Sequence, residues 1–297
     1  MESSKDVGRR PAFFHGTSLA LLVLAPTFVF FMTSLVFFLA YHSSPWLAWL
    51  FVIIFLGLSV LLMLVKRQEP QETFVSSPPR PRFWLKLGLL CFLAVAFGTS
   101  LSLLNFDRNL GMYYAYEGQR KYTNVLPSEP ALSHLDAGQI SFNGAAKLDL
   151  TKAFGYSGRQ GTYCVAPVLD TRNPSGMVHY WAAGLDCCSS SGSFNCNDAQ
   201  NSQAHEGLVI LAEDETEKLD GFREAAKQAA AKYQLTAGKD ALFMHWTDNA
   251  TRAVNSYHNS ATAFFIISVI LYVVFSVGAG MFLHFGTGQT KKKPPPA

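Results

Sequence analysis

The chain has 297 residues, 49% of them hydrophobic and 15% charged, and its formal net charge at pH 7 is +3. A soluble helix needs a polar face, and four long stretches of this chain contain no Asp, Glu, Lys or Arg, so the composition excludes a wholly soluble protein. The small positive charge averages over unlike segments and does not indicate binding to nucleic acid.

Four apolar stretches predict membrane-spanning helices in a multi-pass membrane protein. They cover residues 18–41, 46–65, 87–104 and 261–283. At a rise of about 1.5 Å per residue, each can cross or nearly cross a hydrocarbon layer of roughly 30 Å. The first stretch exceeds the roughly 7–15-residue core of a signal peptide and no clean cleavage site follows it, so we interpret it as a retained span.

Basic residues predict the orientation of these spans. Short flanks rich in Lys and Arg stay on the cytoplasmic side, and four crossings place every basic cluster on that side. Both termini are then cytoplasmic, in residues 1–17 and 284–297, together with the loop 66–86, while residues 105–260 lie outside the cytoplasm. The clusters contain Lys5, Arg9, Arg10, Lys66, Arg67, Arg80, Arg82, Lys86, Lys291, Lys292 and Lys293.

The lipid bilayer is therefore the first predicted partner, in the plasma membrane or a membrane of the secretory pathway. The outside segment 105–260 holds 13 basic and 17 acidic residues, so the positive excess lies in the cytoplasmic segments. That excess can also attract anionic lipid head groups, which is an alternative to its role in orientation. The loop 66–86 is rich in Pro and Arg, and we interpret it as an extended linker.

Small residues recur at four-residue spacing in spans three and four. Such residues let helix backbones approach closely, either within the chain's own bundle or against a partner. The spans contain no ionisable carboxylate, Lys or Arg at depth, which disfavours a channel or transporter. The helix-packing candidates are Ala94, Gly98 and Ser102 in span three, and Ser268, Ser276 and Gly280 in span four, where Tyr272 interrupts the stripe.

The outside segment predicts one compact α+β domain. Aromatic residues at helical spacing extend span three through residues 105–121, and residues 139–150 are rich in strand-forming types. Residues 162–166 and 178–182 predict an antiparallel hairpin. The polar stretch 189–207 predicts an exposed loop.

The second half of the domain predicts a short strand at 208–212 and an amphipathic helix whose apolar residues recur at three and four positions over 219–233. Gly238 is placed to stop this helix. Residues 240–246 predict a last strand, and a helix from about residue 247 continues into span four. The predicted fold is a four-helix transmembrane bundle with a small antiparallel sheet packed on one or two helices.

Cysteine usage predicts two disulfides in the outside domain. Cys164, Cys187, Cys188 and Cys196 lie in the outside segment, and Cys91 lies in span three. A bond between the neighbours Cys187 and Cys188 requires strained geometry, so Cys164 pairs with one of them and Cys196 with the other. The sequence does not choose between these two pairings.

A zinc site is the alternative for three of these cysteines, and its ligands would be Cys187, Cys188, Cys196 and His205. Structural zinc sites place two to four residues between paired ligands. Here Cys187 and Cys188 are adjacent and the next ligands are distant. The spacing favours disulfides, and we predict no metal or cofactor.

Asn249-Ala250-Thr251 is an acceptor sequence for N-glycosylation. An outside location makes Asn249 a candidate glycosylation site, and the short distance to span four is the argument against its use.

Candidate bases are present in the outside domain, but no catalytic motif accompanies them. The sequence contains no Gly-x-Ser-x-Gly, His-Glu-x-x-His, Cys-x-x-Cys or phosphate-loop pattern. Trp181 and Trp246 predict core packing beneath the helix rather than ligand stacking. We therefore predict no catalytic residue. The histidines considered are His134, His179, His205, His245 and His258.

The layout resembles the tetraspanins in outline. That family has four spans, cytoplasmic termini and a large disulfide-bonded loop between spans three and four with adjacent cysteines, a place that Cys187-Cys188 takes here. The family's next residue is Gly where this chain has Ser189, and its large loop is helical where this chain favours strands. The resemblance is one of topology and of a single dipeptide.

These features favour a non-catalytic binding or scaffolding role, in which the outside domain engages another protein or a ligand. A membrane-anchored luminal enzyme is the second hypothesis. A transporter or channel component is the third.

Overall fold

The computed structural model describes residues 13–65, 82–172, 177–189 and 193–285. The basic clusters at 5–10, 66–80 and 291–293 lie outside the described residues. The chain forms two compact units, a helical unit of Met1–Gly111 with Ser260–Ala297 and a sheet domain of Met112–Asn259.

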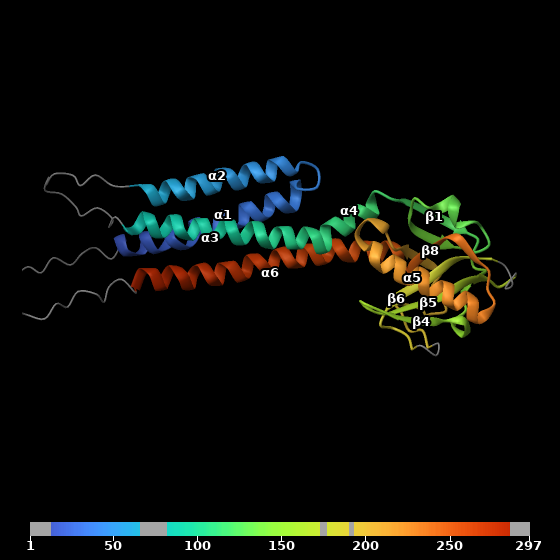
Figure 1. The fold of residues 1–297 in the computed structure, drawn as a ribbon. Coiled ribbons are helices and arrows are strands. Elements are labelled where there is room, and N and C mark those ends of the chain that lie inside the picture. The colour runs from blue at the N-terminus through green and yellow to red at the C-terminus, as the bar shows by residue number, and fades with distance from the viewer. Residues whose placement is uncertain (1–12, 66–81, 173–176, 190–192, 286–297) are drawn as a thin grey trace, which may run out of the picture. The chain divides into compact units, whose positions relative to one another are not determined.

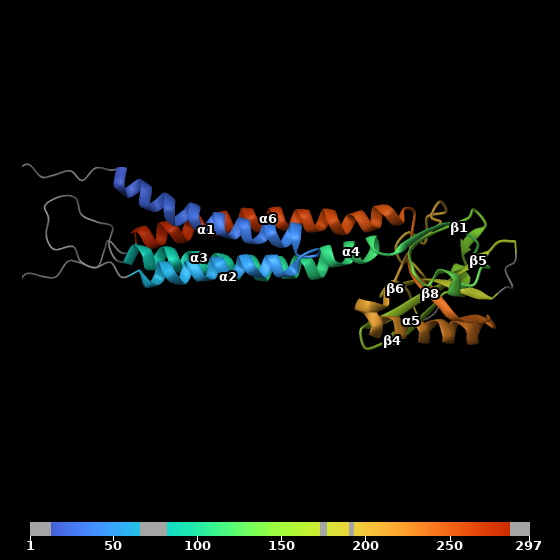
Figure 2. The ribbon, with the colours of Figure 1, turned by 90° about the horizontal axis from the view of Figure 1, so that it is seen from above.

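Four long helices build the helical unit, and they run side by side in both views (Figures 1 and 2). They are α1 (Phe13–Ala40), α2 (Pro45–Leu64), α3 (Arg82–Asn105) and α6 (Ala250–Phe285). Each contains a stretch long and apolar enough to cross a membrane, which confirms the four apolar helices predicted from the sequence.

The helices pack through apolar side chains and leave many others on the outside of the unit. Leu22 of α1 packs with Leu87 and Leu90 of α3, and the ring of Phe30 stacks on Tyr272 of α6 at 4.1 Å. Large side chains such as Phe282 remain exposed. Such a surface suits a hydrocarbon solvent, where apolar exposure has no cost.

After α3 the chain continues as a π-helical turn, η1 (Phe106–Leu110), and a short helix, α4 (Gly111–Glu117). The predicted extension of span three is therefore present, but it ends at Glu117 rather than at residue 121. The next residues, Arg120–Val125, pair as strand β1 instead.

The sheet domain contains an eight-stranded sheet in the order β1-β2-β7-β8-β6-β5-β3, with β4 also paired to β5. The strands are β1 (Arg120–Val125), β2 (Ala137–Phe142), β3 (Ala146–Leu148), β4 (Phe154–Gly158), β5 (Gly161–Asp170), β6 (Val178–Leu185), β7 (Glu206–Val209) and β8 (Ala237–Thr247). Two short 3-10 helices, η2 (Ala131–His134) and η3 (Leu150–Lys152), connect the early strands.

The small antiparallel sheet predicted from the sequence is wrong in size and in strand direction. The predicted hairpin is present, because β5 and β6 are antiparallel with Val165 opposite Ala183. However, β1 with β2 and β6 with β8 are parallel pairs, which arise from longer connections that no local turn signal marks. The sheet also differs from the helical loop that a tetraspanin resemblance implies.

Both faces of the central strands are buried. Helix α5 (Ala212–Tyr233) covers one face, packing Phe222 and Ala229 against Trp181 (Figure 2). The other face is covered by the segment after β6, which places Phe194 and Ala204 in a second core. The stretch 189–207, predicted as an exposed loop, is mainly loop where it is described: polar residues such as Asn195, Gln200 and Gln203 are exposed, and apolar residues such as Phe194 and Ala204 are buried against this face.

Two local predictions fail for identifiable reasons. Helix α5 ends at Tyr233 because Gln234 adopts a left-handed conformation with φ of 54°, and Gly238 lies within strand β8 instead of stopping the helix. Trp181 lies beneath the helix as predicted. Trp246 faces the opposite core, where its ring lies 5.7 Å from that of Phe142.

Candidate functional site

The four cysteines of the sheet domain form two disulfides. Cys164 of β5 bonds to Cys188, and Cys187 bonds to Cys196, with Cα separations of 5.6 and 5.1 Å. Each adjacent cysteine thus takes a different partner, and the structure selects between the two pairings that the sequence left open. Sulfurs in disulfides are not thiolate ligands, so the zinc alternative has no ligand set in this form of the protein.

The disulfides fit against two glycines that the sequence analysis did not single out. A Cβ at Gly184 would lie 2.6 Å from the Sγ of Cys187, and a Cβ at Gly155 would lie 2.8 Å from the Sγ of Cys188. Only glycine leaves room for the sulfurs at these positions. Nothing in the sequence around these glycines marks that role, since the contact is made across strands.

His134 is part of a buried hydrogen-bonded group. Its Nδ1 lies 2.9 Å from the hydroxyl of Tyr180, and its Nε2 lies 3.8 Å from the carboxylate of Glu129. Its ring meets that of Tyr122 edge-on at 4.6 Å. Burial raises the pKa of Tyr180 above its ordinary value. Tyr180 and His134 are buried and belong to the core of the domain, and the exposed member of the group is the carboxylate of Glu129.

The other candidate histidines have separate surroundings. Partial burial lowers the pKa of His179. Nδ1 of His245 lies 3.2 Å from the side-chain amide of Asn197, and the ring of His258 contacts that of Tyr113 at 5.1 Å.

Asn249 lies at the start of α6 and caps it. Its Oδ1 accepts a hydrogen bond from the backbone N–H of Arg252 at 2.7 Å, and Glu206 accepts one from the N–H of Ala250 at 2.7 Å. The hydroxyl of Thr251 donates to Gln139 at 3.1 Å. An open polar hollow surrounds the acceptor sequence; its lining is Glu206, Asn249, Thr251, Arg252, Asn255, Ser256 and Asn259.

Two exposed leucines form an apolar projection on the surface of the domain. Leu132 is 63% exposed and Leu135 is 54% exposed, on and directly after the 3-10 helix η2. Residues three apart eclipse each other in a 3-10 helix, so the two side chains lie on one side of the turn. We name Leu132 and Leu135 the η2 patch. The sequence contains no signal that marks this patch as exposed.

Polar side chains surround the η2 patch. Glu129 precedes the turn and Asp136 follows it, and Asp136 pairs with Arg120 of the edge strand β1 at 3.1 Å. The η2 patch therefore has an acidic residue on either side of it in the chain, and one of these is held by an ion pair to β1.

The predicted helix-packing residues lie inside the helical unit. Ala94 is buried beside Phe30 and Tyr272. A Cβ at Gly98 would lie 3.4 Å from Thr33, and the hydroxyl of Ser276 donates to the carbonyl of Val23 at 3.0 Å.

Two glycines, the predicted Gly280 and the additional Gly88, also lie at close contacts between helices. A Cβ at Gly280 would lie 2.8 Å from Val23 of α1. Gly88, which the sequence analysis missed, lies so close to α2 that its Cβ would be 2.7 Å from the carbonyl oxygen of Ser59. The described small residues thus serve contacts between the chain's own helices.

The chain was compared with protein-family models, with curated proteins and with solved structures, and none of the three comparisons gave a match.

Proposed function

We propose that the chain is an integral membrane protein that crosses the bilayer four times, with both termini in the cytoplasm and the sheet domain outside. The four long apolar helices support this proposal. Lys86 near the start of α3 supports it further, because its Nζ donates to the carbonyl of Leu283 near the end of α6. A cation at a helix C-terminus is favourable, and a basic flank is typical of the cytoplasmic side.

Within this arrangement, the sheet domain is a non-catalytic binding or scaffolding module that engages another protein. The observation that carries this function is the η2 patch. Burial of the two exposed leucines against a partner would gain free energy, and Glu129, Asp136 and Arg120 are charged neighbours that would supply polar contacts at such an interface.

The test compares three forms of the full-length protein captured from mild detergent, with quantitative mass spectrometry of what co-purifies. L132S/L135S removes the patch, and Met177→Ser is a matched control because Met177 is an apolar residue of the same domain that is 48% exposed. We expect a partner that the wild type and the control retain and that the patch variant loses by at least about tenfold, since each leucine contributes about 1–2 kcal/mol of burial. Equal recovery in all three forms contradicts the binding role of the patch.

Glycosylation at Asn249 tests the orientation. An outside location exposes this acceptor to the secretory machinery, and its cap uses only Oδ1 of the side chain. We expect deglycosylation to increase the electrophoretic mobility of the wild type and to leave Asn249→Gln unchanged. Epitope tags at both termini complete the assay. We expect antibodies to detect them only after the plasma membrane is permeabilised, and detection on intact cells refutes the orientation.

A further inference from the structure

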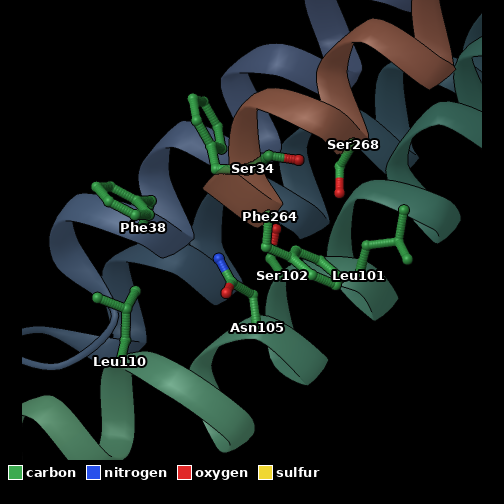
Figure 3. Close-up of a pocket in the computed structure, with 9 residues that line it drawn as sticks. Ser34, Phe38, Leu101, Ser102, Asn105, Leu110, Phe264 and Ser268 are labelled. Atoms are coloured by element: carbon green, nitrogen blue, oxygen red, sulfur yellow. The ribbon is translucent and has the colours of Figure 1, made fainter. Parts of the chain in front are cut away.

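A small cavity that both polar and apolar side chains line lies within the helical unit between α1, α3 and α6. Figure 3 shows the side chains of Ser34, Ser102, Asn105 and Ser268 turned toward a common space. The cavity has a volume of about 10 Å³. That volume accommodates one water-sized group.

Ser34 has a hydroxyl without a protein partner in this cavity. The residue is only 4% exposed and its Oγ makes no hydrogen bond. By contrast, the hydroxyls of Thr33 and Ser59 each donate to the carbonyl four residues earlier, at 2.8 and 2.7 Å. That internal bond is the usual solution in an apolar environment, where an unpaired hydroxyl is costly. Ser34 is therefore set to donate to a group that enters the cavity.

Asn105 forms another part of the cavity wall, and its side chain is held in place by hydrogen bonds. Its Nδ2 donates to the carbonyl of Ala261 at 3.0 Å and its Oδ1 accepts from Asn109 at 2.9 Å, so the amide is held in one orientation. Asn105 is also the residue from which the π-helical turn η1 begins. Such turns frequently occur at functional sites.

The surroundings of the cavity select the kind of ligand. No charged residue lines it, so a neutral group is favoured. Aromatic rings form part of the lining, with the ring centroids of Phe38 and Phe265 5.4 Å apart and Phe264 beside them. A few oriented polar groups beside apolar rings are suited to an amphiphile that has a single polar end.

The depth of the cavity agrees with that chemistry. Ser34 lies six residues before the end of α1 at Ala40, which is about 9 Å along the helix. Ser102 lies five residues before Asp107, the first charged residue of the helix that continues α3, or about 7.5 Å. In a bilayer these levels lie just beneath the head groups, within reach of a hydroxyl on a membrane lipid.

We propose that this cavity binds the hydroxyl group of a neutral membrane amphiphile with a single polar end, such as a sterol, with Ser34 as the hydrogen-bond donor to the hydroxyl oxygen. The inference rests on the proposed membrane insertion of the helical unit. A bound water is the competing occupant, because it has the same hydrogen-bonding chemistry and size.

The experiment uses the full-length protein in phosphatidylcholine nanodiscs with a photoactivatable cholesterol analogue, and measures the labelling that excess cholesterol displaces. Ser34→Ala should reduce this saturable labelling by about 3- to 10-fold, the effect of one lost hydrogen bond. Ser59→Ala is the matched control and should label like the wild type, because that buried hydroxyl is already bonded within α2. A 3-deoxy analogue has no oxygen to accept the hydrogen bond. It should label the wild type and Ser34→Ala weakly and equally.

Two results overturn the proposal. Equal saturable labelling of wild type and Ser34→Ala removes Ser34 as the donor, and the absence of saturable labelling assigns the cavity to water. Resistance to extraction at alkaline pH, measured on the same samples, separates this failure from failure of the proposed membrane insertion, which requires that the protein resist extraction.

Discussion

Replacing both cysteines of one disulfide by alanine should destabilise the sheet domain by an amount set by the length of chain that the bond closes. The Cys164–Cys188 bond joins residues 24 apart and the Cys187–Cys196 bond joins residues 9 apart. The loop-closure relation gives about 3.5 kcal/mol for the longer loop and about 2.6 kcal/mol for the shorter one. The C164A/C188A variant should therefore lose about 0.9 kcal/mol more than C187A/C196A.

Packing losses should be similar in the two variants, so the difference between them reports loop length. Each pair contains one fully buried cysteine, Cys164 or Cys196, and one partly buried cysteine, Cys188 or Cys187. The cavity contribution to each variant is thus comparable.

The assay is pulse proteolysis of the full-length protein in detergent across a urea series, following the fraction of domain that resists cleavage. Cys91→Ala serves as the control, because Cys91 is free and lies in the helical unit. A C187A/C196A variant that is less stable than C164A/C188A, or either variant with wild-type stability, refutes the reasoning.

Two further perturbations test the packing and the electrostatics of the sheet domain. Gly221→Ala places a Cβ 2.2 Å from the buried ring of Tyr163. Overpacking of about 1–3 kcal/mol should exceed the helix-propensity gain of about 1 kcal/mol. The urea midpoint of Gly221→Ala should fall while that of Gly144→Ala, whose new Cβ meets nothing within 4 Å, stays near the wild-type value; equal midpoints contradict this. Burial lowers the pKa of His179 in the folded state, so the unfolded state binds the proton more readily and stability should fall as pH drops below about 6.5. His179→Gln should flatten this fall in urea titrations at a series of pH values, and an unchanged pH profile would show that His179 does not contribute.

The sequence predicts the four apolar helices well because their signal is local. Length and the absence of charge are enough: the ends of α1, α2 and α3 lie within five residues of the predicted spans, and α6 begins at Ala250, near the predicted start at residue 247. The β5–β6 hairpin is predictable for the same reason, since strand-forming residues flank a turn. Strand β1 was not predicted, because its sequence, Arg120–Val125, continues a helical aromatic pattern and only pairing with β2 makes it a strand.

The candidate sites were less predictable because they depend on contacts between distant segments. The two disulfide pairings differ only in which neighbour, Cys187 or Cys188, faces Cys164, and that depends on the turn at Asp186, which has φ of 53°. Leu132 and Leu135 are two isolated apolar residues in a polar connection, a pattern that does not indicate exposure. Ser34 has the sequence of an ordinary serine in an apolar helix, and only the structure shows its hydroxyl unpaired.

The strand order of the sheet has a consequence for biosynthesis. β8 is the last strand to leave the ribosome, yet it lies between β7 and β6 at the centre of the sheet. Until Thr247 has been translated, the nascent chain can hold only two half-sheets, β1-β2-β7 and β6-β5-β3, each with a bare inner edge. A polypeptide stalled before Ala237 therefore exposes two strand edges with unpaired backbone groups. Cellular quality control should recognise this intermediate far more readily than the completed domain.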